Sequence, residues 1–100
     1  MGASGRASYL TAIARRTSLF RFYPRAALEN RERGRVVVRI TVARDGRVVD
    51  ARVSQSSGSR SIDAAEVETV LKSSPFPPLP PDIPGERVAF EVPVNYDLPN

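Results

Sequence analysis

The segment from Arg87 to Leu98 alternates between apolar and polar side chains, and no other feature constrains the fold as strongly. A period of two predicts a β-strand with one buried face, because successive side chains in a strand point to opposite faces of the sheet. The apolar positions are Val88, Phe90, Val92, Val94, Tyr96 and Leu98. Pro93 has no amide proton to donate, so a ladder on that side would be broken. We therefore expect an edge strand, with Pro93 turned toward the open side or placed at a bulge.

A second alternating segment begins at Arg35 and leads into a tight turn. Its apolar positions are Val36, Val38, Ile40 and Val42. Asp45 and Gly46 are residues that tolerate positive φ in such a turn. A further strand from Arg47 to Ser54 follows. Its expected core face consists of Val49, Ala51 and Val53. The two strands together predict a β-hairpin.

Two helices are expected before the hairpin. Apolar residues at helical spacing predict an amphipathic helix from Tyr9 to about Phe20, with Ser8 as its N-cap. The expected stripe is Leu10, Ile13, Ala14, Thr17 and Phe20. Pro24 suits the first turn of a second, short helix that reaches about Arg33. Gly34 is placed to end that helix.

A third helix is expected after a serine-rich loop over residues 54–61. Asp63 and Glu66 have the spacing of a capping box, and Ile62 would pack against Val67 as its hydrophobic staple. The helix must stop before Pro75. Its expected buried stripe is Val67, Val70 and Leu71.

Five prolines within residues 75–81 require an extended chain after this helix. A Pro-rich segment of this kind can be a recognition motif for an SH3-like partner, or a stiff strap that crosses back over the domain. Phe76 and Leu79 have the character of anchors, and we therefore favour the strap.

One hundred residues are enough for a single compact domain. The order of elements predicts an α+β fold: a three-stranded antiparallel sheet with helices packed on one face, in the order α-α-β-β-α-β. The third strand should return beside the first. We expect residues 1–8 to be a disordered or engineered start, and residues 9–98 to form the domain.

The sequence contains no cysteine and no histidine. Disulfides, thiolate zinc sites, and the Ser-His and Cys-His pairs of nucleophilic catalysis are therefore excluded. No side chain of ordinary pKa could act as a base at neutral pH. We expect no catalytic residue, no metal and no cofactor. There is also no run of about 18 apolar residues that would span a membrane.

Positive charge is concentrated in the first part of the chain. Residues 1–60 carry thirteen arginines and four acids, whereas residues 61–100 carry two bases and seven acids, which gives +9 followed by −5. A basic nucleic-acid-binding module is therefore an alternative. Its residues would be Arg15, Arg16, Arg21, Arg25, Arg35 and Arg39, with Phe20, Phe22 and Tyr23 as stacking groups. Codon bias in a GC-rich genome also produces arginine, and we expect no nucleic-acid partner.

The order of motifs over residues 9–98 resembles that of TonB C-terminal domains. The motifs are Tyr23-Pro24, Ala26-Ala27, Gly34, the alternating valines, Asp45-Gly46-Arg47-Val48, Ser56-Ser57-Gly58, Ile62-Asp63, Pro75-Phe76-Pro77-Pro78-Leu79-Pro80, and Val88-Ala89-Phe90-Glu91-Val92-Pro93-Val94. Each motif alone is weak, but their order and spacing together are specific.

The resemblance implies the periplasmic C-terminal domain of a TonB energy transducer, a non-enzymatic module. Such a protein is anchored in the inner membrane of a Gram-negative bacterium and takes energy from the proton-motive force through ExbB and ExbD. The anchor that would contact ExbB and ExbD is not in this chain. The domain would bind the TonB box of TonB-dependent outer-membrane transporters, which import siderophores, haem or cobalamin, by β-strand addition.

The resemblance also implies which residues bind the transporter peptide. They are Val88, Ala89, Phe90, Glu91, Val92, Pro93, Val94, Asn95 and Tyr96 on the last strand, with Phe22, Tyr23 and Pro24 nearby. The best-known members carry a glutamine-rich stretch before Tyr-Pro, where this sequence has Phe20-Arg21-Phe22. The first helix should shield the sheet and keep the isolated domain monomeric. A TolA-like periplasmic adaptor is the nearest alternative, and the Tyr-Pro and Pro-Phe-Pro-Pro-Leu-Pro segments favour TonB.

Overall fold

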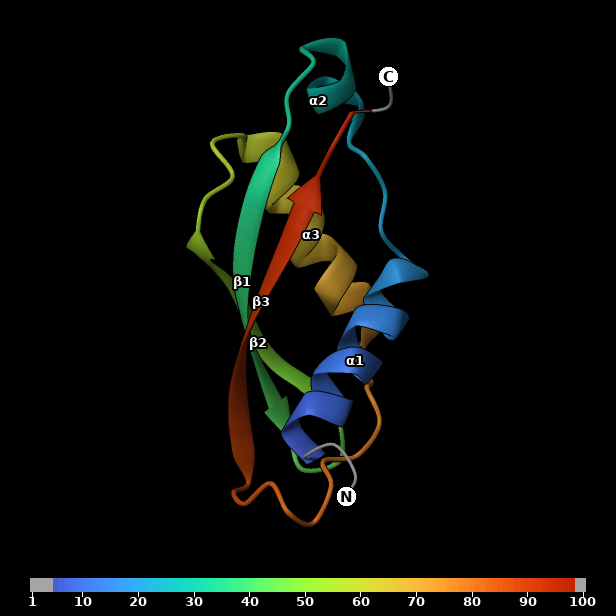
Figure 1. Cartoon of the computed structure of the whole chain (residues 1–100), viewed down its shortest axis with the longest axis vertical. Helices are drawn as coiled ribbons and strands as arrows, with labels where there is room; N and C mark the ends of the chain where they lie inside the picture. The colour runs from blue at the N-terminus through green and yellow to red at the C-terminus, as the bar shows by residue number, and fades with distance from the viewer. Residues whose placement is uncertain (1–4, 99–100) are drawn as a thin grey trace.

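The computed structural model describes residues 5–98 and contains one three-stranded antiparallel sheet with helices on one face (Figure 1). The strand order is β2-β1-β3, so the last strand returns beside the first. This arrangement confirms the predicted fold class. The elements are α1 (Gly5–Ser18), α2 (Arg25–Glu29), β1 (Gly34–Ala43), β2 (Val48–Gln55), α3 (Arg60–Ser73) and β3 (Arg87–Tyr96).

The central strand β1 supplies the middle of the hydrophobic core. Its four alternating apolar residues, Val36, Val38, Ile40 and Val42, are at most 1% exposed. On the same face, Phe90 and Tyr96 of β3 are buried. The predicted core faces of β1 and β3 are therefore correct, although β3 ends at Tyr96 and not at Leu98.

Strand β2 departs from the predicted alternation because it contains a β-bulge. Thr41 pairs with Asp50, whereas the next residue, Val42, pairs with Val48. Val49 is thus an extra residue that shifts the alternation of the strand by one position. The residues of β2 that pack against the core are Val48, Ala51 and Val53. The prediction that Val49 shares this face is wrong.

Helix α1 begins four residues earlier than predicted. The amide of Gly5 donates to the Asp82 carboxylate at 2.9 Å, so a residue distant in the sequence satisfies the helix end that Ser8 was expected to cap. Residues 5–8 of the start that was expected to be disordered or engineered are thus helical, and residues 1–4 lie outside the described residues. The buried stripe is Tyr9, Ile13 and Thr17, while Leu10 is half-buried and Ala14 is exposed.

Helix α2 is shorter than predicted and ends before Gly34. Arg31 adopts the left-handed conformation, with φ of 51°, and the amide of Glu32 donates to the carbonyl of Ala27 at 2.8 Å. These contacts close the helix end in the way that a glycine commonly does. Gly34 instead begins β1, where a Cβ atom would lie 2.4 Å from the carbonyl oxygen of Ser57.

The N-cap of helix α3 is Ser59, and the predicted capping box at Asp63 is wrong. Ser59 Oγ accepts the amide of Ile62 at 3.2 Å. Asp63 lies one turn inside the helix, where its carboxylate accepts the amide of Ser57 at 2.9 Å and the hydroxyl of Ser56 at 2.5 Å. Burial opposes ionisation of Asp63, but these hydrogen bonds outweigh it and lower its pKa. Asp63 therefore holds the serine-rich loop.

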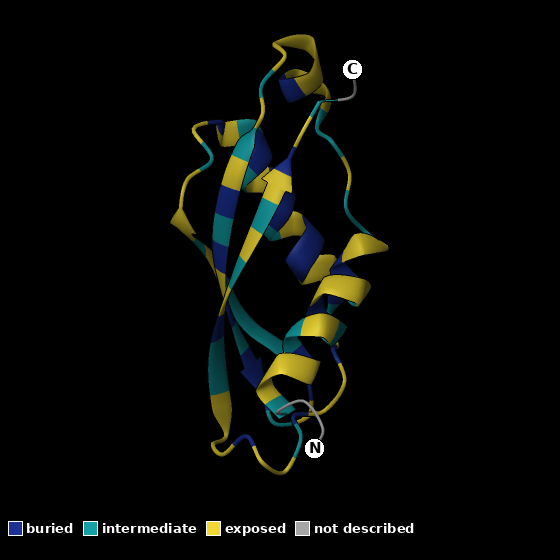
Figure 2. Ribbon diagram, in the orientation of Figure 1, coloured by how far each residue is buried: buried dark blue, intermediate teal, exposed yellow. Residues whose placement is uncertain are grey.

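Helix α3 lies across the sheet and buries one face against it (Figure 2). The buried residues are Ile62, Ala65, Glu66, Thr69, Val70 and Ser73. Val70 was predicted correctly, but Leu71 is 54% exposed, so the predicted stripe is displaced around the helix. The helix ends at Ser73, before Pro75, as expected.

The proline strap, residues 75–81, crosses the end of the sheet as predicted. Phe76 and Leu79 are 2% and 5% exposed and anchor it in the core. The amide of Phe76 donates to the carbonyl of Gly46 in the hairpin turn at 2.9 Å. Gly46 has φ of 96°, and a Cβ atom there would lie 2.0 Å from the carbonyl oxygen of Phe76. Only glycine fits both the turn and the strap.

Arg44 fastens the chain that follows the strap. Its guanidinium donates to the carbonyl of Pro80 at 3.1 Å and also to the carbonyls of Ile83 and Gly85. The loop before β3 is therefore held to the end of β1, which fixes where β3 begins.

Candidate functional site

Strand β3 is an open edge of the sheet. It pairs with β1 on one side, and within residues 5–98 no strand pairs with its other side. In Figure 1 the middle of β3 crosses in front of the other strands, with no element between it and the viewer. The prediction of an edge strand is therefore correct.

The phase of the ladder determines which backbone groups of β3 face the open side. Opposite residues in an antiparallel pair alternate between hydrogen-bonded and non-hydrogen-bonded positions. The amide of Arg44 donates to the carbonyl of Glu86 at 3.0 Å, which makes this pair a hydrogen-bonded one. The register continues unbroken from Ala43 and Arg87 to Gly34 and Tyr96. Even-numbered residues of β3 therefore bond to β1. The odd-numbered residues, Arg87, Ala89, Glu91, Pro93 and Asn95, direct their backbone groups outward.

Pro93 occupies an outward position, so its missing amide costs the ladder to β1 nothing. Its partner in the register is Val37, in a non-hydrogen-bonded pair. Between Ala89 and Asn95, the open edge thus offers the amides of Ala89, Glu91 and Asn95, and the carbonyls of all four odd-numbered residues. Of the two placements expected for Pro93, the structure has the proline facing the open side, and there is no bulge in this register.

The other edge of the sheet, formed by β2, is less suited to accept a strand. Its register with β1 shifts twice, between the partners of Val37 and Val38 and again at Val49. Bulges twist an edge and interrupt its row of amides and carbonyls, which protects it from pairing. The regular edge of the sheet is β3.

The Tyr-Pro segment lies close to only part of this edge. Tyr23 packs edge-on against Tyr96, with ring centroids 5.5 Å apart, and its hydroxyl donates to the carbonyl of Glu32. Phe22 and Pro24 instead line a shallow hollow with α3, and Phe22 is 40% exposed with the Lys72 ammonium 5.8 Å from its ring centroid. The structure therefore brings Tyr23 to the end of β3 and turns Phe22 and Pro24 toward α3.

A buried ion pair fixes the end of β3 to the helices. Glu66 is 1% exposed, and its carboxylate accepts two hydrogen bonds from Arg21, at 2.9 and 2.8 Å. The hydroxyl of Tyr96 donates to the same carboxylate at 2.7 Å, and Arg21 also donates to Thr17 Oγ1 at 3.1 Å. The sequence patterns did not predict this network. The available signal was the position of Glu66, at helical spacing from Ile62 and Val70 on the buried face.

The network shifts the pKa values of its members. The hydrogen bond to Glu66 raises the pKa of Arg21, which keeps the guanidinium charged. Burial raises the pKa of Tyr96, and the hydrogen bond to Glu66 raises it further. Burial also raises the pKa of Tyr9 to about 12, and the Tyr9 hydroxyl donates to the carbonyl of Pro77 at 2.7 Å. Each of these shifts has a structural cause, in burial or in the bond to Glu66.

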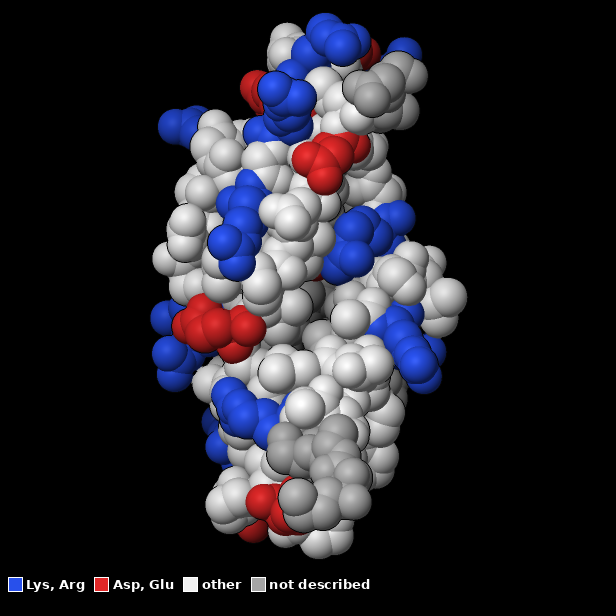
Figure 3. All heavy atoms as spheres, viewed as in Figure 1, with Lys and Arg blue, Asp and Glu red and all other residues white. Residues whose placement is uncertain are grey.

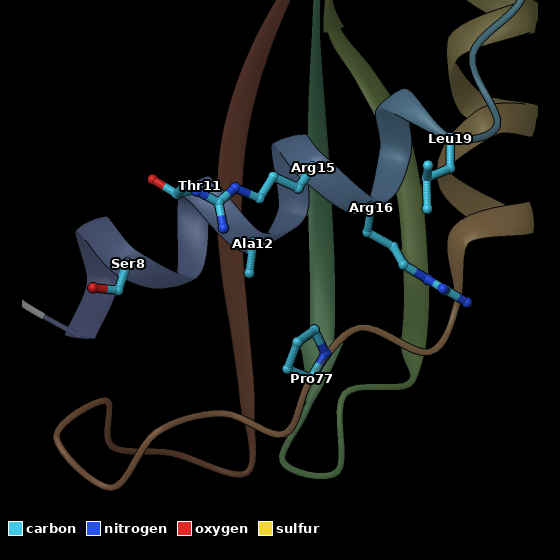
Figure 4. A pocket seen from close by; sticks show the side chains of 7 residues that line it. All are labelled: Ser8, Thr11, Ala12, Arg15, Arg16, Leu19 and Pro77. Atoms are coloured by element: carbon cyan, nitrogen blue, oxygen red, sulfur yellow. The ribbon is translucent and has the colours of Figure 1, made fainter.

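A groove of about 340 Å³ lies on the outer side of α1 (Figure 4). Its lining consists of Ser8, Thr11, Ala12, Arg15, Arg16, Leu19 and Pro77. Arg16 Nε donates to the carbonyl of Ser73 at 3.0 Å, so it serves to join two helices. The lining contains no carboxylate that could act with a hydroxyl as an acid or base, and the groove is not a candidate active site.

The arginines proposed for nucleic-acid binding do not form one surface. Arg21 is bound to Glu66, Arg25 to Glu29 at 3.1 Å, and Arg39 lies 3.8 Å from Glu91. In Figure 3 the basic side chains are scattered and separated by acidic and uncharged atoms. Nucleic-acid binders usually concentrate basic groups on one face, so this arrangement disfavours that alternative.

These observations place the protein in the class of small domains that can bind a partner at an open sheet edge. It is a small α+β domain with one regular open sheet edge and, within residues 5–98, no cluster of acidic side chains that could hold a metal ion. Among the helices of the same part of the chain, none is long and apolar enough to cross a lipid bilayer.

Comparison with known proteins places the domain within this class. The family model for the Gram-negative bacterial TonB protein C-terminal matches residues 21–98, and the chain belongs to this family. It is 32% identical over 93 residues to Protein TonB of Pasteurella multocida (strain Pm70), covering 93% of this chain and 35% of that protein. It is 33% identical over 92 residues to Protein TonB of Haemophilus influenzae, covering 92% and 33%. The chain thus spans about a third of the length of these relatives.

Solved structures have the same fold. A solution structure of the Helicobacter pylori TonB C-terminal domain matches with a TM-score of 0.80 and 27% identity, covering 99% of this chain and 87% of that chain. A solution structure of TolAIII bound to a peptide derived from the N-terminus of TolB matches with a TM-score of 0.67 and 25% identity, covering 91% and 77%. The family is one of energy transducers and interaction domains, not of enzymes.

Proposed function

We propose that this domain binds the TonB box of outer-membrane TonB-dependent transporters by adding it as a strand to β3. The observation that carries the proposal is the unbroken register of β3 with β1, which leaves a regular row of outward amides and carbonyls. The TolAIII structure supports it, because a related fold is seen there with a peptide bound.

The chemistry of such a site needs backbone groups and no catalytic residue. Between Ala89 and Asn95, three amides and four carbonyls of the edge face outward. Each new hydrogen bond contributes about 1 kcal/mol net. Ordering a flexible peptide on binding costs several kcal/mol of this gain. Backbone hydrogen bonds alone therefore give a weak contact, with an affinity no tighter than roughly millimolar. Such a contact forms and releases readily, as a transducer requires.

The wider role is part of the same proposal. By its family, the full-length protein is periplasmic, is anchored in the inner membrane, and receives proton-motive-force energy through ExbB and ExbD. It would pass this energy to transporters that import siderophores, haem or cobalamin. The chain described here would supply the contact with the transporter.

Titration of the isotope-labelled domain, followed by amide chemical shifts, tests the binding site. The probes are synthetic peptides of the N-terminal periplasmic segments of outer-membrane transporters from the same genome. Because only odd-numbered residues face outward, the amides of Glu91 and Asn95 should shift more than those of Val92 and Val94.

The matched control is a peptide with alternate amides N-methylated. Methylation in one phase removes the donors that face β3 and should abolish binding, whereas methylation in the other phase should leave binding intact. Equal effects of the two phases, or a response confined to another surface of the domain, would contradict strand addition at β3.

A further inference from the structure

The start of α1 makes a specific contact with the open edge of β3. Arg6 Nη2 donates to the carbonyl of Ala89 at 3.4 Å, and its guanidinium lies 4.8 Å from the ring centroid of Phe90. Ala89 is one of the outward-facing residues, so its carbonyl is among the groups that an added strand would use. The part of the edge nearest α1 is therefore already engaged by this chain.

Contacts on both sides of Arg6 hold the first turns of α1 in place. Gly5 is bound to Asp82, and a Cβ atom at Gly5 would lie 2.0 Å from the Asp82 carboxylate. Tyr9 lies one turn further on, with its ring centroid 5.3 Å from that of Phe90. The contacts of Gly5 and Tyr9 thus help to hold the Arg6 backbone in place, so that its side chain extends over β3.

On the C-terminal side of Ala89, the remaining open groups lie between Glu91 and Asn95. They are the amides of Glu91 and Asn95 and the carbonyls of Glu91, Pro93 and Asn95, because Pro93 has no amide. The Glu91, Pro93 and Asn95 side chains are all exposed, whereas Ala89 is only half-exposed. The edge therefore has a boundary between Ala89 and Glu91.

We infer that Arg6 sets the register of the partner strand, by blocking its extension to Ala89 and confining it to the edge from Glu91 to Asn95. This inference rests on the proposed function and adds a residue that limits the site. An added strand that reached Ala89 would have to displace the guanidinium from both the carbonyl and the Phe90 ring. A partner confined beyond this point forgoes the amide and carbonyl of Ala89.

Amide shifts and affinities of Arg6 variants test the inference, with the same synthetic transporter peptides as probes. In the unaltered domain the shifts should end at Glu91. In Arg6→Ala they should extend to Ala89, and the dissociation constant should fall about fivefold for each hydrogen bond that the partner gains there. Arg6→Met, which keeps an unbranched apolar chain over Phe90 without a donor, separates the hydrogen bond from the packing and should give a smaller gain.

Arg15→Ala is the matched control, because Arg15 is an exposed arginine of the same helix that lines the groove away from β3. It should leave both the footprint and the affinity unchanged. A shift at Ala89 in the unaltered domain, or an Arg6→Ala variant with the same footprint and affinity, would overturn the role of Arg6 while leaving strand addition intact. Peptides that leave β3 unperturbed in every variant would overturn the proposed function as well.

Discussion

Glu66 is a buried charged residue whose replacement should disturb the fold. It accepts hydrogen bonds from Arg21 and Tyr96 inside the protein, and its removal leaves a largely buried guanidinium without its counter-charge. Removing one partner of a buried pair costs about 3 kcal/mol. We expect this loss for Glu66→Ala in urea denaturation.

The control lies on the same helix. Glu68 is exposed and lies 3.5 Å from Lys72, one turn away. Such a surface pair contributes less than about 0.5 kcal/mol, so Glu68→Ala should change stability little. Equal losses in the two variants would show that the network around Glu66 does not stabilise the domain.

Tyr96 gives the same network a pH dependence. Burial and the bond to Glu66 raise its pKa in the folded state, so the unfolded chain ionises first, at a pH of about 10. Its contribution to stability is therefore complete below about pH 10 and is lost as the pH rises beyond that. Denaturation at a series of alkaline pH values should give a shallower decline for Tyr96→Phe than for the unaltered domain. Parallel declines would contradict this assignment.

At the scale of elements, the hairpin turn and the proline strap depend on each other through Gly46. Gly46→Ala places a Cβ atom against the carbonyl of Phe76 as well as in a positive-φ conformation, so it should displace the strap. Gly58 is a natural control, because it has φ of 93° and nothing within 4 Å of its would-be Cβ. Gly58→Ala should cost only about 1 kcal/mol of backbone strain.

Both variants strain the backbone at a positive φ, but only Gly46→Ala also places a Cβ atom against the Phe76 carbonyl. The difference in stability between them therefore measures the cost of that contact. In chemical denaturation Gly46→Ala should lose clearly more stability than Gly58→Ala. An equal loss of stability in both variants would mean that the proline strap can move away from the new Cβ atom without destabilising the domain.

The elements that could be predicted from sequence were those determined by local pattern. Alternation placed β1 and β3 and their core faces, and the prolines placed the strap and the end of α3. The failures all involve partners distant in the chain. Asp82 supplies the start of α1, and a bulge opposite β1 changes the core face of β2. No window of sequence around those elements contains this information.

The candidate site also combines features that the local sequence predicts with features that depend on distant residues. The edge position of β3 followed from alternation and Pro93, but the outward phase of its amides required the observed register. Phe22 and Pro24 were grouped with β3 by family resemblance, whereas the structure turns them toward α3. Arg6 was not predicted, because its contact with Ala89 joins residues 83 positions apart.

At the scale of the whole molecule, Pro93 should limit self-association as well as partner binding. Edge strands with complete rows of donors can pair with one another, and proline is one device that prevents it. Pro93→Val restores an outward amide without touching the ladder to β1. We expect the unaltered domain to sediment as a monomer and Pro93→Val to associate as its concentration rises.

Pro84→Val is the control for this experiment, because Pro84 is an exposed proline of the loop before β3. It should remain monomeric over the same concentrations in sedimentation velocity. Association of both variants, or of neither, would remove the protective role of Pro93.

The direction of β3 has a mechanical consequence. The domain measures 44 × 29 × 21 Å, and β3 runs along its long dimension (Figure 1). A strand added to β3 would lie parallel to this axis, so tension along the axis would load its hydrogen bonds in shear, all at once. Tension across the axis would instead unzip them one by one. Pulling a bound peptide in these two directions should therefore give a higher rupture force for the lengthwise pull.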